Sequence, residues 1–210
     1  MLPDPKDKAR VLVSMRDARQ LTDRLEYDAA IALLRKVVAE NPEIKDAWLQ
    51  LGVLCVRAGR YDEALSAFRR LVETDPSDAE SIVSVAGVLV ALDRLDEAKA
   101  HADMALQKTG GNQNARTSAC EILVKVALRR GDAAAARRYA AVSAQADPSF
   151  PLEPYVEGLI LHRERKFDEA LPNLLETARL MEGRLSTLPE LYYYTGDTLA
   201  NLGRAVEAEA

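Results

Sequence analysis

The stretch Lys45–Asp78, KDAWLQLGVLCVRAGRYDEALSAFRRLVETDPSD, decides the fold of this chain. Its first half places small and apolar side chains on one face of a helix, at the spacing that such a face requires: Trp48, Leu51, Gly52 and Cys55. Gly59 can take the left-handed conformation that ends a helix. A second amphipathic helix begins at Tyr61 and ends before Pro76, because the residue before a proline avoids the α conformation. The stretch therefore predicts a helical hairpin.

The same design recurs along the chain with a period of 34 residues, which is typical of a solenoid of stacked helix pairs. Alanines mark the period at spacings of 34, 34, 38, 34 and 38 residues: Ala30, Ala64, Ala98, Ala136, Ala170 and Ala208. A larger side chain at these positions would push the two helices of a pair apart. One hairpin leaves its outer faces in water, so neighbouring hairpins must cover them. We therefore predict an all-α solenoid of about five and a half repeats.

The predicted domain organisation follows from this period. Residues 1–10 are expected to be a linker or tail, and residues 11–210 the solenoid. Two four-residue insertions account for the spacings of 38, and Gly110-Gly111-Asn112 marks the first of them as a loosened turn: Gln113–Arg116 and Leu185–Leu188. The predicted repeats are Val11–Ile44, Lys45–Asp78, Ala79–Asn112, Thr117–Phe150, Pro151–Arg184 and a partial copy from Pro189 to Ala210.

The pattern of the repeat resembles the tetratricopeptide repeat (TPR). The residues that carry the resemblance are Trp48, Leu51-Gly52, Tyr61, Ala64, Phe68 and Pro76. The fourth repeat departs from the pattern with an alanine run, Ala133–Ala136, and the third lacks the closing proline. The resemblance implies a right-handed superhelix of antiparallel helix pairs. It also implies that the first helix of each pair lines a concave groove that binds peptides or protein segments.

A second likeness lies at the N-terminus. Leu2–Asp7 resembles the segment that joins bacterial sulfatase-type hydrolases to a C-terminal repeat tail, although the sulfatase nucleophile motif Cys-x-Pro-x-Arg is absent. This likeness implies an alternative function, as an accessory C-terminal repeat domain of a larger bacterial enzyme. A third alternative is an oligomerisation module, because the unfinished last repeat leaves an apolar flank that could pair with another copy.

Composition and motifs argue against several classes of function. The net charge of −5 is spread along the chain, without a basic patch for nucleic acid or for a membrane surface. No run of 18 apolar residues and no apolar signal-peptide core occur. A cytoplasmic location is the default, and a periplasmic one is open if the chain is a fragment of an exported protein.

Catalytic and cofactor sites are not expected. His101 and His162 lie 61 residues apart, outside any metal-binding motif, and no phosphate-binding glycine motif occurs. Cys55 and Cys120 belong to non-adjacent repeats, so we expect two buried thiols and no disulfide. The chain is predicted to be a non-enzymatic protein without cofactor or metal.

The predicted groove has an apolar middle and a basic rim, which favours a partner with acidic and apolar residues. Its residues lie between the packing positions of each first helix: Arg16, Arg19, Leu49, Val53, Arg57, Val83, Lys125, Arg129, Tyr155, Leu159, Arg163 and Tyr193. The alternative is that these side chains pack internally or mediate self-association. A Lys/Asn clamp for C-terminal carboxylates is not expected, because Arg19 and Val53 occupy the asparagine positions.

Overall fold

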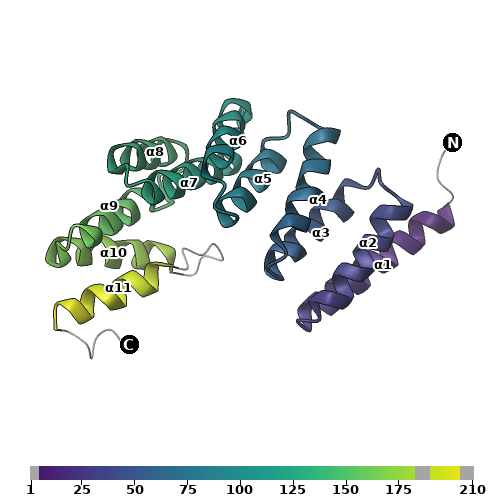
Figure 1. The fold of residues 1–210 in the computed structure, drawn as a ribbon, viewed down its shortest axis with the longest axis horizontal. Coiled ribbons are helices and arrows are strands. Elements are labelled where there is room, and N and C mark those ends of the chain that lie inside the picture. The colour runs from purple at the N-terminus through teal and green to yellow at the C-terminus, as the bar shows by residue number, and fades with distance from the viewer. Residues whose placement is uncertain (1–4, 183–189, 204–210) are drawn as a thin grey trace. The chain divides into compact units, whose positions relative to one another are not determined.

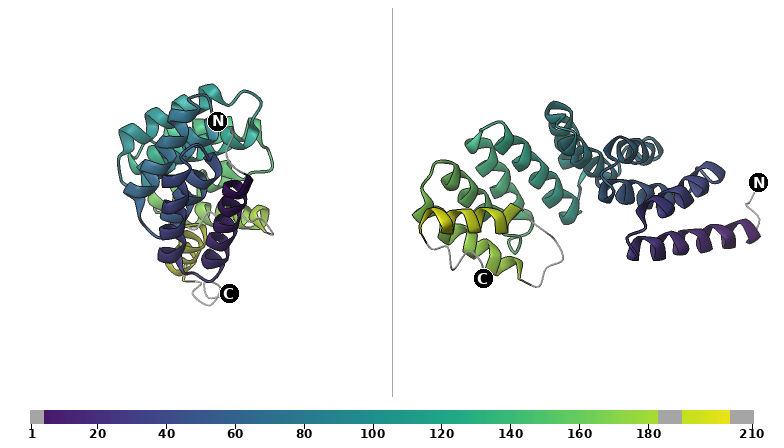
Figure 2. Two further views of the ribbon diagram at one scale, coloured as in Figure 1. Left: turned by 90° about the vertical axis from the view of Figure 1, so that its right-hand side faces the viewer. Right: turned by 60° about the horizontal axis from the view of Figure 1, so that its bottom comes forward.

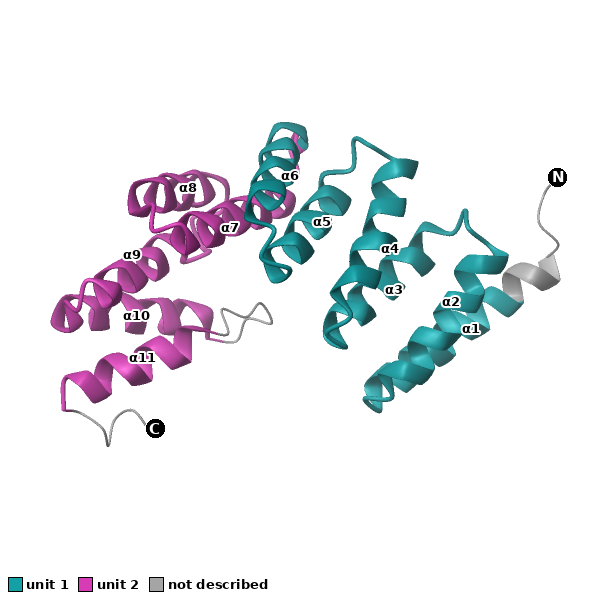
Figure 3. Ribbon diagram, viewed as in Figure 1, with its two compact units in different colours: residues 1–108 teal, residues 109–210 magenta. Residues whose placement is uncertain are grey.

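The computed structural model describes residues 5–182 and 190–203, with side chains from Arg10 onward. This part of the chain contains eleven α-helices and no strand, and consecutive helices pack against each other in pairs (Figure 1). The predicted all-α architecture of helix pairs is confirmed. Contacts divide the chain into two compact units, residues 1–108 and 109–210 (Figure 3), which are described separately below.

Unit 1 consists of three helix pairs. In each pair the first helix packs on the second, and the second helices of the first two pairs also pack on the first helix of the next pair. Figure 2 shows this order in the purple-to-teal part of the ribbon. The helices are α1 (Pro5–Asp23), α2 (Tyr27–Glu40), α3 (Lys45–Arg57), α4 (Tyr61–Thr74), α5 (Ala79–Ala91) and α6 (Leu95–Lys108).

Unit 2 continues the design with two pairs and a further helix. The second helix α8 packs on α9, and α11 packs on both α10 and α9. The helices are α7 (Gln113–Arg129), α8 (Ala133–Ala146), α9 (Leu152–Arg163), α10 (Phe167–Met181) and α11 (Glu190–Asn201).

Two predicted boundaries differ from the structure. Helix α1 begins at Pro5, so the expected linker is helical from that residue onward. The first insertion is not a loosened turn: Gln113–Arg116 form an additional first turn of α7, and the Asn112 side chain accepts a hydrogen bond from Ala115 N at 3.0 Å. Asn112 is a favourable N-cap residue, so the extra residues extend the helix at little cost. The second insertion, Leu185–Leu188, lies outside the described residues.

The core of the α3–α4 pair is built from small and large side chains that face each other. Gly52 in α3 lies against Phe68 in α4, and a Cβ atom on Gly52 would come within 2.5 Å of the Phe68 ring. Both residues are buried, as is Ala64 one turn earlier in α4. The small residues therefore let the two helices approach closely, as their spacing predicts.

Candidate functional site

A hollow of about 400 Å³ lies on unit 1 where α1 and α3 approach each other over α2. We call it the α1–α3 hollow. Four of the predicted groove residues line it, namely Arg19, Leu49, Val53 and Arg57. The other lining residues are Ala18, Thr22, Asp23, Leu34, Gln50 and Leu54.

The helical period of α3 explains why apolar side chains line this hollow. Leu51, Leu54 and Cys55 occupy the face of α3 that packs into the core, and all three are buried. Leu49 and Val53 are four residues apart, so they share another face. They remain 44% and 42% exposed. Large aliphatic side chains gathered at a hollow and left in contact with water are typical of a binding surface.

The arginines of the α1–α3 hollow differ from other arginines of unit 1 in their pairing. Arg35, Arg60 and Arg69 each form an ion pair with a carboxylate elsewhere in the unit. Arg19 and Arg57, by contrast, have no ion-pair partner among the described residues. Asp23 is the only acidic lining residue, so the lining carries a formal charge of +1. The hollow therefore combines apolar surface with two guanidinium groups that are available to an anion.

A smaller hollow of about 250 Å³ adjoins the first and shares Leu49 with it. Its lining comes from α3, α4 and α5 and includes Lys45, Glu80, Ser81 and Ser84. Two predicted groove residues of unit 1 lie outside both linings: Val83 is half-buried, and the Arg16 guanidinium pairs with Asp17 at 3.2 Å. The surface in unit 1 is thus centred on α3.

Two predicted groove residues of unit 2 are not on the surface. Tyr155 and Leu159 are only 2% and 4% exposed, so their expected role in contacting a ligand is wrong. Both lie on α9, which packs on α7, α10 and α11 and is buried over most of its length. The Tyr155 hydroxyl donates to Glu190 Oε2 at 3.2 Å, and burial is the main cause that raises the pKa of this phenol. These side chains build the core of unit 2.

Other predicted residues of unit 2 are held by partners within the unit. Lys125 Nζ pairs with Glu121 Oε1 at 2.7 Å, and the Arg163 guanidinium donates to the carbonyl oxygen of Leu128. Arg129 is exposed at the end of α7. Tyr193 is exposed and stacks edge-on against Tyr194, with ring centroids 5.3 Å apart.

The sequence reasoning missed a pair that joins α9 to α11. His162 Nε2 lies 2.7 Å from Asp197 Oδ2, and the imidazole also contacts the rings of Tyr194 and Phe167 at centroid distances of 5.0 and 5.5 Å. His162 and Asp197 are 35 residues apart, as are Tyr155 and Glu190. A search for complementary side chains at this separation between successive first helices would have found both pairs.

The thiols and histidines form no reactive or metal-binding cluster in the part of the chain that the structure describes. Cys55 and Cys120 are both free and buried, as expected. Burial raises the pKa of both thiols, that of Cys120 to about 11. No group of three or more potential metal ligands occurs among the described residues. None of the described helices combines the length and the apolar character needed to cross a bilayer.

Family models for the tetratricopeptide repeat match residues 16–79 and 56–117. Solved structures share the fold. PilW, described as a type IV pilus biogenesis factor, has 19% identity over 95% of this chain and 90% of its own, with a TM-score of 0.73. Pseudomonas aeruginosa PilF has 18% identity over 97% and 90%, with a TM-score of 0.69. YrrB, described as a TPR protein with an unusual peptide-binding site, has 19% identity over 82% and 87%, with a TM-score of 0.54.

No curated protein sequence matches the chain. The likeness of Leu2–Asp7 to the sulfatase linker therefore stays a prediction, and these residues lie partly outside the described part of the chain. TPR proteins are generally non-enzymatic scaffolds, and their fold supports a role in binding proteins or peptides. The family matches, the stacked helix pairs and the structural neighbours agree: residues 16–117 are tetratricopeptide repeats, and the described part of the chain has the fold of tetratricopeptide-repeat proteins.

Proposed function

We propose that this protein binds a peptide or protein segment in the α1–α3 hollow of unit 1. The observation that supports the proposal is the coincidence of exposed aliphatic side chains, Leu49 and Val53, with two arginines that lack an ion-pair partner among the described residues. A segment that docks one or two apolar side chains would cover the aliphatic surface. A carboxylate beside them would meet Arg19 or Arg57.

The charges of the hollow favour an acidic partner over a basic one. Arg57 lies one helical turn from Val53 on α3, so a guanidinium adjoins the apolar contact area. Complementary charge contributes to selectivity and to the association rate even where it adds little affinity. The partner class is therefore a segment in which Asp or Glu stands next to Leu, Ile, Val or Phe.

Panning a random peptide library on the immobilised full chain tests this proposal. We expect the selected peptides to be enriched in an acidic residue next to an aliphatic or aromatic one. Fluorescence polarisation then gives the affinity of a selected peptide for the wild type and for variants. Arg57→Glu should weaken binding at least tenfold, since it replaces an attraction by a repulsion.

A matched control separates the hollow from a general effect of charge. Arg24 also has no ion-pair partner among the described residues, but it does not line the hollow. Arg24→Glu should leave the affinity within twofold of the wild type. Equal weakening by both substitutions, or selected peptides that are basic, would contradict the proposal.

A further inference from the structure

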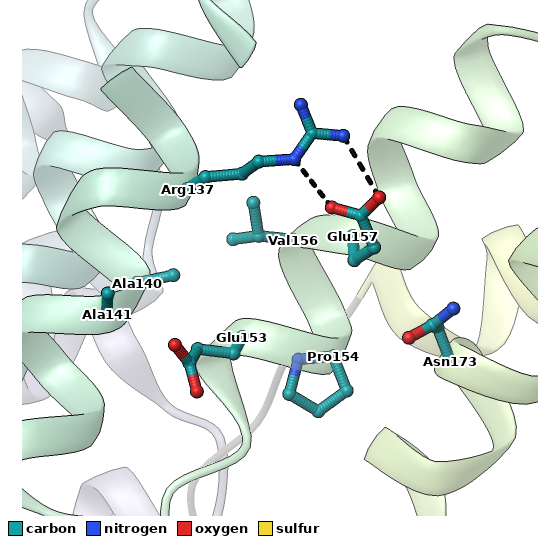
Figure 4. A pocket seen from close by; sticks show the side chains of 8 residues that line it. All are labelled: Arg137, Ala140, Ala141, Glu153, Pro154, Val156, Glu157 and Asn173. Atoms are coloured by element: carbon teal, nitrogen blue, oxygen red, sulfur yellow. Dashed lines mark hydrogen bonds and ion pairs between the residues drawn. The ribbon is translucent and has the colours of Figure 1, made fainter. Parts of the chain in front are cut away.

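A second hollow lies on unit 2 between α8, α9 and α10 (Figure 4), and none of its lining residues belongs to the α1–α3 hollow. We call it the α8–α10 hollow, and its volume is about 530 Å³. Val156 and Ala140 at its base are buried, whereas Ala141 and Pro154 are partly exposed. The full lining is Arg137, Ala140, Ala141, Glu153, Pro154, Val156, Glu157 and Asn173.

Equivalent positions in the repeats of unit 1 explain why this hollow exists. Where α8 has Ala141, α2 has Arg35 and α4 has Arg69. The Arg35 guanidinium pairs with Glu63 in the first turn of α4, which is the second helix of the next pair. Arg69 Nη2 likewise lies 3.8 Å from Glu97 Oε2. An arginine thus links α2 to the first turn of α4, and another links α4 to the first turn of α6.

This bridge is missing between α8 and α10. Glu169 in the first turn of α10 is the equivalent of Glu63 and Glu97, and it receives no arginine from α8. Glu169 lies one turn before Asn173, whose Nδ2 donates to the Glu169 backbone oxygen at 3.0 Å. Residues four apart share a face of a helix, so Glu169 is on the same face of α10 as the lining residue Asn173.

The arginine that lines the hollow, Arg137, already forms an ion pair within unit 2. Arg137 occupies the position of the buried residues Ile31, Leu65 and Leu171 in other repeats. Its Nε and Nη2 atoms bond Glu157 at 2.7 and 3.0 Å (Figure 4). This two-point geometry satisfies both partners. Glu153, at the other side of the hollow, is exposed and has no ion pair among the described residues.

We propose that the α8–α10 hollow binds an arginine-bearing apolar segment of a partner protein, whose guanidinium supplies the bridge that α8 lacks. The apolar base accepts the flanking side chains, and Glu153 and Glu169 attract the guanidinium. Complementary charge of this kind selects a basic partner and disfavours an acidic one. The surface and the preferred charge both differ from those of the α1–α3 hollow.

The test uses the full chain, labelled with 15N, and a capped tripeptide, acetyl-Leu-Arg-Leu-amide, as the probe. The matched probe carries citrulline in place of arginine, which keeps the shape and removes the charge. We expect saturable amide shifts at residues 140, 141, 153 and 156 with the arginine probe. The citrulline probe should bind at least fivefold more weakly. Shifts confined to other residues, equal binding of both probes or no saturable shift at all would overturn the proposal.

Three variants test the assignment to this hollow. Ala141→Arg installs the arginine found at Arg35 and Arg69, so it should fill the hollow and weaken the arginine probe more than tenfold. Ala100→Arg adds the same side chain at an exposed position of α6 and should change binding less than twofold. Replacing both carboxylates, Glu153→Gln with Glu169→Gln, should make the two probes equivalent. Unchanged binding to Ala141→Arg, or an unchanged arginine preference in the double variant, would overturn the proposal.

Discussion

At the scale of single residues, helix pairs in both units join a small side chain to a larger one where their helices cross. Gly52 faces Phe68, and Gly158 faces Leu174, whose side chain would lie 2.7 Å from an added Cβ. The fourth repeat inverts the sizes, with Val124 and Ala140 at the equivalent positions. In these three pairs the small side chain is matched by a larger one, as close packing requires, whereas the third repeat has two buried alanines, Ala86 and Ala102, at these positions.

The inverted pair predicts how a swap in unit 1 behaves. Gly52→Val should destabilise by about 1–3 kcal/mol through overpacking, and Phe68→Ala by about 3–5 kcal/mol through the cavity it leaves. The unfolding free energy lost in the double variant should be smaller than the sum of the two single losses by about 1–3 kcal/mol. Urea unfolding of the four proteins measures this coupling. Strictly additive losses would show that the side chains at positions 52 and 68 do not fill the same space between the helices.

The buried thiol of Cys120 predicts a loss of stability at alkaline pH. Burial raises its pKa to about 11, whereas the unfolded chain has an ordinary thiol pKa of about 9. The folded state therefore keeps its proton longer, and the stabilisation that is complete below pH 9 is lost by about pH 11. The loss amounts to about 2–3 kcal/mol.

Lysine and tyrosine side chains also titrate at alkaline pH. Comparing the unfolding free energies of the wild type and Cys120→Ala separates the effect of the Cys120 thiol from theirs. The difference in unfolding free energy between wild type and variant should shrink between pH 8.5 and 11, if both are measured in the same urea series. A difference that is constant over this range would rule out the thiol as its cause.

At the scale of the helical hairpin, the turn between the two helices has a residue with positive φ, and the residue type at that position does not always indicate it. Gly59 has φ +70°, as the sequence led us to expect. The equivalent positions in the first, third and fifth repeats are Leu25, Asp93 and Arg165, with φ of 63°, 57° and 61°. The stacking of the two helices thus imposes a left-handed residue even where glycine is absent.

Leu25 offers a direct measure of this strain. Its side chain is 71% exposed, so a change to glycine removes little packing. Leu25→Gly should stabilise the protein by about 0.5–1 kcal/mol, since glycine adopts positive φ without the cost borne by other residues. Gly59→Ala should destabilise by a similar amount. Thermal unfolding of both variants tests this, and a Leu25→Gly protein that melts lower would contradict it.

The bounds of a helix could be predicted where the apolar period and the residues that begin or end helices agreed. The start of α4 at Tyr61 and its end before Asp75 coincide with the expected helix. The insertion at Gln113–Arg116 was misread, because Gly110 and Gly111 indicated a turn without saying on which side the extra residues would lie. The cap formed by Asn112 decided in favour of a longer α7.

At the scale of the molecule, the sequence predicted six copies of one groove lining, and the structure gives the two units different surfaces. In unit 1 the predicted positions Leu49 and Val53 stay open. In unit 2 the equivalent positions, Tyr155 and Leu159 respectively, become core, because α7, α10 and α11 all pack on α9. Periodicity identifies equivalent positions but not how many neighbours cover each of them.

This difference predicts opposite consequences for the same substitution in the two units. Val53→Glu should leave the unfolding free energy within about 0.5 kcal/mol of the wild type, because the new carboxylate stays in water. Leu159→Glu should cost about 3–5 kcal/mol, because it places an unpaired charge in the core. Circular dichroism during urea unfolding distinguishes them. A strongly destabilised Val53→Glu would mean that the hollow is core as well.

The proposed function places a bound ligand on unit 1, against α1 and α3. Its most direct test is the amide shift map of the 15N-labelled chain on titration with an acidic, apolar peptide selected from the library. We predict that the largest changes cluster at residues 18–23 and 49–57. Changes that cluster instead on α9 and α11, with residues 18–23 and 49–57 unmoved, would contradict the claim.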